Sequence, residues 1–149
     1  MGGYLNGLTR YVTSLSVSYP THKFFYHNKG SIPETNISAA SATGYAILSK
    51  DIQNFSATSS AAFIYTRSLF YYADPVNSLA TVSWFVHNTT GRHALQNLPA
   101  EIVANHPILD ITNMKHESTS FYLESLPYEK VILSELQNES YISRGITIY

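Results

Sequence analysis

Histidine is the residue type in this chain that is best suited to chemistry at neutral pH, because its imidazole ionises there and also binds metals. The chain has six His and no Cys among its 149 residues. His22 and His27 are five positions apart, and His87 and His93 are six apart. Neither pair has the i, i+4 spacing that places two imidazoles on one helix face, and no His-Glu-x-x-His occurs. We therefore expect neither a metal site nor a cofactor.

Covalent catalysis would need an activated nucleophile, and the sequence does not point to one. The absence of Cys excludes a thiolate nucleophile and a disulfide framework. The 19 serines include no Gly-x-Ser-x-Gly elbow, and the glycine-rich phosphate loops of nucleotide and dinucleotide enzymes are missing. The sequence favours a chain that is not an enzyme, with a small enzyme whose site no local motif marks as an alternative.

The charge balance excludes several kinds of partner. Nine basic and ten acidic residues give a formal net charge of -1, and 32 positions are Ser or Thr. Such a chain has no basic field for nucleic-acid phosphates, so we expect no nucleic-acid partner. The longest apolar run is Ala61 to Tyr65, which is far short of the roughly 20 residues that cross a bilayer. We expect no membrane span in this chain.

Hydrophobic alternation predicts that most elements are strands in one domain spanning residues 1–149. Thr9 to Tyr19 alternates apolar and hydroxyl side chains, and Pro20 ends that run. Val82, Trp84 and Val86 should share one side of a later strand. Further strands are expected at Lys23 to Tyr26, Gly44 to Ser49, Ala61 to Tyr71, Ala80 to His87 and Ile142 to Tyr149, and an extended segment at Ile108 to Ile111. A helix is the alternative for residues 56–72, because Ala61, Ile64, Leu69 and Tyr72 could share one helix face.

Two short helices complete the predicted α+β fold, with a mainly antiparallel sheet. The first should begin at Asn97 and Pro99 and bury Ile102 and Val103. The second, Tyr128 to Asn138, has the pattern of an amphipathic helix. Asp51 is a further candidate helix N-cap. Turns are expected at Asn28 to Gly30, Asp74 to Asn77 and Asn88 to Gly91, and polar connections at Ser31 to Ser41 and Thr112 to Thr119.

Aromatic residues are abundant, with 12 Tyr and seven Phe. Tyr65, Phe70, Tyr71 and Tyr72 could form a binding surface, because Tyr joins an apolar ring to a polar tip. The alternative interpretation is that these rings fill the margin of the core.

Four Asn-x-Ser/Thr sequons mark possible glycosylation sites at Asn36, Asn54, Asn88 and Asn138. The alternative is that they are ordinary polar turns.

Residues 82–109 contain a series of short motifs that resemble those of a known protein family. Trp84-Phe85, Asn88-Thr89-Thr90-Gly91, His93-Ala94-Leu95 and Asn105-His106-Pro107 follow one another there. This order resembles the extracytoplasmic region of A-subfamily ABC transporters, which export lipids. The interval between His93 and Asn105 is shorter than in that family. The resemblance covers about 28 of the 149 residues, and the chain would correspond to one exposed fragment of such a transporter.

The resemblance implies a non-catalytic binding or interaction module on the extracytoplasmic side, with a lipid or a protein as partner. It also implies that Trp84, His93 and His106 organise a strand-turn-helix corner and that a ligand lies against the aromatic face. A different hypothesis is a self-assembling structural subunit of a filament or viral particle. That hypothesis depends on low charge and on edge strands expected at both termini, which would allow oligomers.

Overall fold

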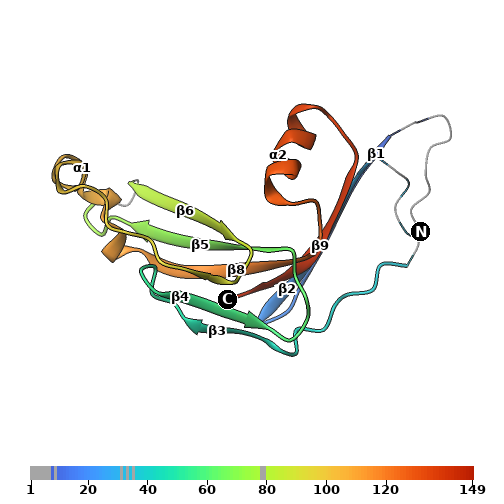
Figure 1. Ribbon diagram of the computed structural model, residues 1–149, viewed down its shortest axis with the longest axis horizontal. Coiled ribbons are helices and arrows are strands. Elements are labelled where there is room, and N and C mark those ends of the chain that lie inside the picture. Colours follow the sequence, from blue (N-terminus) through green and yellow to red (C-terminus); the bar gives the residue numbers. More distant parts are fainter. Residues whose placement is uncertain (1–7, 9, 31, 33, 35, 78–79) are drawn as a thin grey trace.

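A curved six-stranded antiparallel sheet forms the middle layer of the molecule in the computed structural model (Figure 1). A helix, α2, lies over one face of this sheet, and a three-stranded antiparallel sheet covers the opposite face. The structure describes residues 8, 10–30, 32, 34, 36–77 and 80–149. The two faces of the large sheet therefore have different neighbours.

The strand order of the large sheet is β1-β2-β9-β8-β5-β6, and that of the small sheet is β3-β4-β7. The strands are β1 (Tyr11–Ser18), β2 (His22–Gly30), β3 (Tyr45–Ser49), β4 (Phe55–Ser59), β5 (Tyr65–Ala73), β6 (Thr81–Asn88), β7 (Arg92–His93), β8 (Lys115–Glu124) and β9 (Tyr141–Ile148). The helices are α1 (Ala100–Asn105), α2 (Tyr128–Leu136) and the 3-10 turns η1 (Pro107–Leu109) and η2 (Ile111–Asn113).

The hydrophobic core lies between the two sheets. Phe70, Phe121 and Ile146 of the large sheet are fully buried there against Phe55 of β4. The rings of Phe55 and Phe70 meet edge to face with centroids 5.6 Å apart. Burial of a Phe or Ile side chain is worth about 1.5–3 kcal/mol, so this layer supplies a large part of the folding free energy.

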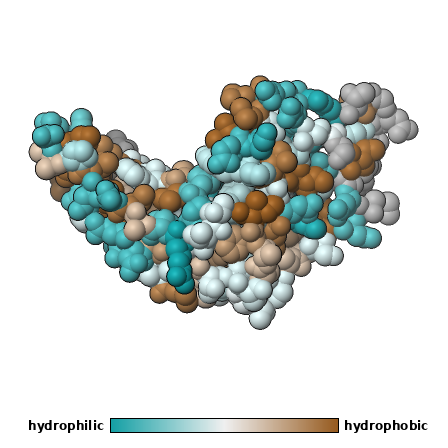
Figure 2. Space-filling view, in the orientation of Figure 1, coloured by the Kyte–Doolittle hydropathy of each residue, from teal (hydrophilic) through white to brown (hydrophobic). Residues whose placement is uncertain are grey.

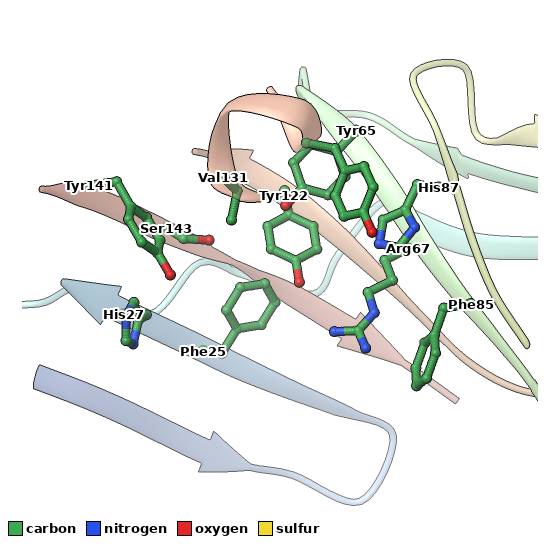
Figure 3. Close-up of a pocket in the computed structure, with 11 residues that line it drawn as sticks. Phe25, His27, Tyr65, Arg67, Phe85, His87, Tyr122, Val131, Tyr141 and Ser143 are labelled. Atoms are coloured by element: carbon green, nitrogen blue, oxygen red, sulfur yellow. The ribbon is translucent and has the colours of Figure 1, made fainter. Parts of the chain in front are cut away.

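Successive side chains on a strand point to opposite faces, and the large sheet uses both faces. On β2, Phe24 and Tyr26 are buried on the core side, whereas Phe25 and His27 point toward α2 (Figure 3). The same alternation holds on β5, where Phe70 lies in the core and Arg67 lies on the helix side. The helix-side face is the one that stays partly open.

The predicted α+β class, with a mainly antiparallel sheet and two short helices, is confirmed. The strands β1, β3, β6 and β9 lie close to their predicted positions. The turn at Asn88 to Gly91 is also confirmed: the Thr90 N–H donates to Asn88 Oδ1 (3.1 Å), and Gly91 adopts a φ of 72°. None of the helices in the described part of the chain is long and apolar enough to span a membrane.

Several expectations for the strands were wrong. The turn predicted at Asn28 to Gly30 lies inside β2, where Asn28 is buried and pairs in register with Thr13 and Ile142. The polar connection predicted at Thr112 to Thr119 contains the start of β8. Its hydroxyls pair with hydroxyls on neighbouring strands, as in the 3.0 Å contact between Ser68 Oγ and Thr119 Oγ1. The strand β4 was not predicted separately.

The expected helix features also differ. Asp51 does not begin a helix: its Oδ1 accepts from the Gln53 N–H (2.9 Å) in a turn before β4. Pro99, not Asn97, stands at the N-cap of α1, and no residue of α1 is buried. Residues 107–113 form 3-10 turns where an extended segment was expected. The C-terminal strand β9 lies between β2 and β8, so β1 is a sheet edge and β9, which was also expected to be one, is not.

Candidate functional site

A pocket of about 440 Å³ lies on the helix side of the large sheet, between the sheet and α2 (Figure 3). Six of its eleven lining residues are aromatic, namely Phe25, Tyr65, Phe85, Tyr122, Tyr128 and Tyr141. The others are His27, Arg67, His87, Val131 and Ser143. We call this pocket the aromatic trough. Its size is within the range of sites that bind small molecules.

The wall of the trough is built from rings that pack on one another across strands. Tyr65 and Tyr122 are directly opposite in the β5–β8 register, and their rings stack with centroids 4.2 Å apart. The Tyr122 ring meets the Phe25 ring edge to face at 5.0 Å. Gly145 of β9 lies between these two residues in register, so no side chain separates the rings. The result is a continuous aromatic row across four strands.

Helix α2 closes one side of the trough. The Tyr128 ring stacks on the His87 ring with centroids 3.7 Å apart, and Val131 faces the same pocket. The N–H of Glu139 donates to Ser134 O (2.8 Å) at the C-terminal end of α2, and Ser134 is buried. Near the same end of the helix, Glu135 bonds with Lys29 of β2 and Tyr141 of β9, so α2 contacts the sheet at both of its ends.

A second hollow of about 620 Å³ adjoins the trough. Tyr65, His87 and Tyr128 line both spaces and form the wall between them. The Glu129 carboxylate and Asn88 line the second hollow only. In the space-filling view, the upper side of the molecule is hollowed between α2 and the end that carries α1 (Figure 2).

Arg67 is the one cationic side chain among the eleven residues that line the trough. Its guanidinium carbon lies 4.0 Å above the centre of the Phe85 ring. Its Nε is buried without a hydrogen-bond partner, and no carboxylate of the described residues forms an ion pair with it. Figure 3 shows the guanidinium group pointing into the middle of the trough. An anion could therefore approach it without displacing a protein partner.

Two acidic groups, Glu135 and Glu124, are paired with cations other than Arg67. Glu135 of α2 lies 2.8 Å from Lys29 Nζ, and the Tyr141 hydroxyl donates to its other oxygen (2.6 Å). These hydrogen bonds lower the pKa of Glu135. Glu124 lies 2.6 Å from Arg144 Nε. No carboxylate lines the trough itself, so its lining carries the positive charge of Arg67.

Two histidines, His27 and His87, line the trough. Burial, and then the nearby Arg67 charge, lower the pKa of His87 from 6.5 to about 4. His27 Nδ1 shares a hydrogen bond with Ser14 Oγ (2.9 Å), and its Nε2 is buried without a partner. No carboxylate of the described residues bonds to either ring to orient it as a general base.

A second pair of histidines lies between the sheets. His93 and His116 both stack on the Phe55 ring, with centroids 4.6 Å and 5.2 Å from it. Burial lowers the pKa of each, and that of His116 falls to about 4. His116 Nε2 lies 2.8 Å from Thr119 Oγ1. These imidazoles act as core residues. Among the residues that the structure describes, no group of three His, Cys, Asp or Glu could hold a metal ion.

The residues singled out from sequence lie in different places. Trp84 packs against the core and His93 lies between the sheets, whereas His106 is exposed after α1. Tyr65 lies in the trough. Tyr71 and Tyr72 line another hollow at the far end of β5.

The four sequon asparagines also differ in exposure. Asn36, Asn54 and Asn138 are exposed, whereas Asn88 is half-buried.

Sequence reasoning missed most of the trough, including Arg67, Phe25, Phe85 and Tyr122. A local signal was present, because three strands contain an aromatic residue followed two positions later by a nitrogen-bearing side chain. These pairs are Phe25 and His27, Tyr65 and Arg67, and Phe85 and His87. Alternation puts both members of each pair on the same face.

Comparison with protein families, curated proteins and solved structures gives no match to this chain.

Proposed function

We propose that this chain is a non-catalytic extracytoplasmic binding module, similar to part of a lipid-exporting ABC transporter, and that the aromatic trough holds its apolar ligand. The observation that carries this proposal is the trough: six aromatic side chains converge on one pocket of about 440 Å³. Removing apolar surface from water contributes about 25 cal/mol per Å². Rings that are already packed on one another lose little conformational freedom when a ligand binds.

The stretch that resembles the transporters contributes directly to this site. Phe85 and His87 lie on β6 within that stretch and line the trough. Asn88, Thr89 and Thr90 follow in the turn and line the adjoining hollow. The stretch that resembles the transporters therefore forms part of the lining of both the trough and the adjoining hollow.

The chemistry of the lining supports binding rather than catalysis. His87 stacks on Tyr128, and its lowered pKa makes it a poor proton donor at neutral pH. Ser143 is the one serine in the lining, and no hydrogen bond of the described residues joins it to a histidine. A nucleophile needs such an adjacent base.

The proposal is tested by titrating the purified chain with N-phenyl-1-naphthylamine, an uncharged apolar molecule whose fluorescence rises in apolar surroundings. A Val131→Trp variant places a bulky ring in the trough, and we expect at least tenfold weaker binding. Ile132 is exposed on the same helix and does not line the trough. The matched Ile132→Trp variant should bind like the wild type. Equal binding by all three proteins would place the probe elsewhere and contradict the proposal.

A second candidate is the self-assembling subunit, because β1 and β6 are the outer strands of the large sheet. Outer strands present backbone groups that can pair with another chain. Val12 on β1 is 68% exposed and Phe85 on β6 is 49% exposed, so both edges also offer apolar side chains. Size-exclusion chromatography with light scattering tests this candidate. A monomer at high protein concentration would contradict it.

A further inference from the structure

We infer that the aromatic trough selects apolar monocarboxylates, with Arg67 as the residue that binds the carboxylate. This inference rests on the proposed binding function and specifies the class of ligand. It depends on how Arg67 is held, on the charges around it and on the shape of the neighbouring apolar surface.

A cation–π contact holds the guanidinium group of Arg67 in position. Its carbon lies 4.0 Å above the centre of the Phe85 ring, a contact that uses none of the N–H donors as hydrogen bonds. The edge of a guanidinium carries paired N–H donors whose geometry matches the two oxygens of a carboxylate. No hydrogen bond from these donors to another described residue is present, and the buried Nε has no partner. Arg67 therefore has open donors in a partly desolvated site.

The charges around the trough favour a ligand that carries one negative charge. Glu124 and Glu135 are paired with Arg144 and Lys29, and Glu129 lines the adjoining hollow rather than the trough, so none of the three forms an ion pair with Arg67. His87 is uncharged at neutral pH, because burial and Arg67 lower its pKa. The lining thus carries a single positive charge, which matches a monocarboxylate better than a doubly charged phosphate monoester. Burial of an unpaired ligand anion without such a cation would be costly.

The remaining surface of the trough suits an apolar body next to that carboxylate. Tyr65 and Tyr122 present stacked rings beside Arg67, and Phe25 continues the row (Figure 3). Val131 is the one aliphatic side chain in the lining. A flat aromatic acid and the chain of a fatty acid both offer the required chemistry, and the probes below separate these two sources.

The test compares matched ligands that differ only in charge. The probes are 2-naphthoate against 2-naphthamide and decanoate against decanamide, measured by displacement of N-phenyl-1-naphthylamine from the full chain. We expect each acid to bind at least tenfold more tightly than its amide. Tighter binding of 2-naphthoate identifies the ligand as an aromatic acid, and tighter binding of decanoate identifies it as a fatty acid. Equal affinity of both acids and their amides would overturn the inference.

Variants at Arg67 assign the selectivity to this side chain. Arg67→Met should reduce the preference for the acids to less than threefold while still binding the uncharged probe. Arg67→Lys keeps the charge without the paired donors and should retain part of the preference. The control is Arg92→Met, which removes an equal charge from the exposed Arg92 on β7. A similar loss in Arg92→Met would also overturn the inference.

These outcomes separate the two proposals. If the uncharged probe binds and Val131→Trp blocks it but the acids show no preference, the binding module stands and the role of Arg67 is wrong. If no probe responds to Val131→Trp, the proposed function itself fails. Retention of probe binding by Arg67→Met shows that this variant is folded. If it fails to bind the probe, Arg67→Lys decides the question through its remaining preference.

Discussion

The rings of His87 and Tyr128 stack with centroids 3.7 Å apart and planes inclined by 19°. His87 lies on β6, an outer strand of the large sheet, and Tyr128 is the first residue of α2. Elsewhere α2 exposes much of its surface, including Leu133 and Leu136. This stack is therefore a principal link between the helix and the edge of the sheet, and it also forms the wall between the two hollows.

Replacing Tyr128 by Ala should loosen α2 from the sheet. An aromatic pair contributes about 0.5–1.5 kcal/mol beyond the burial of its surface, so we expect a loss of about 1–3 kcal/mol in the free energy of unfolding. Relative to the wild type, hydrogen exchange in this variant should become faster for the α2 amides than for the β5 amides. Leu136→Ala is the control, since Leu136 is 79% exposed and should change stability by less than about 0.5 kcal/mol. Unchanged α2 exchange in Tyr128→Ala would show that the stack does not hold the helix.

The sequence predicted β6, whose two faces differ in polarity, but not the hydroxyl-rich start of β8. β6 alternates Val82, Trp84 and Val86 with polar or exposed residues, and its prediction was accurate. β8 contains Ser118, Thr119 and Ser120, which resemble a polar loop. In the sheet their hydroxyls find partners, as in the 2.7 Å contact of Ser120 Oγ with Thr147 Oγ1. Such pairs depend on strand order, which is not visible locally.

The trough was missed for the same physical reason. Phe25, Arg67 and Tyr122 come from strands that are distant in sequence and meet only through the order β2-β9-β8-β5. The alternation of each strand predicts which side chains share a face, but not which strands are neighbours. The local pairs of aromatic and nitrogen-bearing residues could be found in the sequence. That these pairs meet in one pocket could not be predicted from it.

Trp84 and His106 offer a direct contrast in stability, because the resemblance assigned both to one structural corner. Trp84 packs against the core, whereas His106 is exposed after α1. Trp84→Ala should lower the free energy of unfolding by about 2–4 kcal/mol. His106→Ala should change it by less than about 0.5 kcal/mol. Urea unfolding followed by circular dichroism measures both values. Similar losses would mean that His106 has a structural role that its exposure does not indicate.

Gly145 should not tolerate a side chain. A Cβ added there would lie 2.0 Å from the backbone oxygen of Phe121 and 2.8 Å from the Phe25 ring. Backbone cannot give way as a flexible side chain can, so we expect Gly145→Ala to cost about 3 kcal/mol or more. The same change should weaken probe binding, since Phe25 and Tyr122 meet across this position. A thermal melt and the probe titration measure the two effects. An unchanged melting temperature would show that β9 shifts easily.

Acid should destabilise the protein through two half-buried histidines, His87 and His116. The pKa values of His87 and His116 are lowered from 6.5 to about 4, chiefly by burial. The unfolded chain takes up these protons near pH 6.5, and the folded chain does so only near pH 4. Stability is therefore fully present above about pH 7 and is lost as the pH falls from about 6.5 to about 4. Urea midpoints across this range should fall, and His116→Gln should show a smaller fall than the wild type. If the urea midpoint fell equally with pH in both proteins, the acid sensitivity would not come from His116.

A bound carboxylate should raise the pKa of His87 part of the way back toward its ordinary value. The positive charge of Arg67 is the second cause of its lowered pKa, after burial. An anion beside Arg67 offsets that charge and should raise the pKa of His87, and Arg67→Met should raise it in the absence of ligand. NMR titration of the imidazole resonances with and without 2-naphthoate measures this change. A pKa of His87 that does not respond to the ligand would place the carboxylate away from Arg67.

The four sequons should differ in glycan occupancy if the chain passes through a secretory pathway. Asn88 is half-buried, its Oδ1 accepts from Thr90 N–H (3.1 Å), and its Nδ2, the atom that would carry a glycan, lies 3.4 Å from His93 Nδ1. Asn54 and Asn138 are exposed. We expect glycans on the exposed asparagines and little or none on Asn88. Glycopeptide mass spectrometry of the secreted chain measures the occupancy. Asn54→Gln should remove one glycan from the intact mass, and Asn88→Gln should remove none. Full occupancy of Asn88 in a folded product would mean that the turn after β6 opens to admit a glycan.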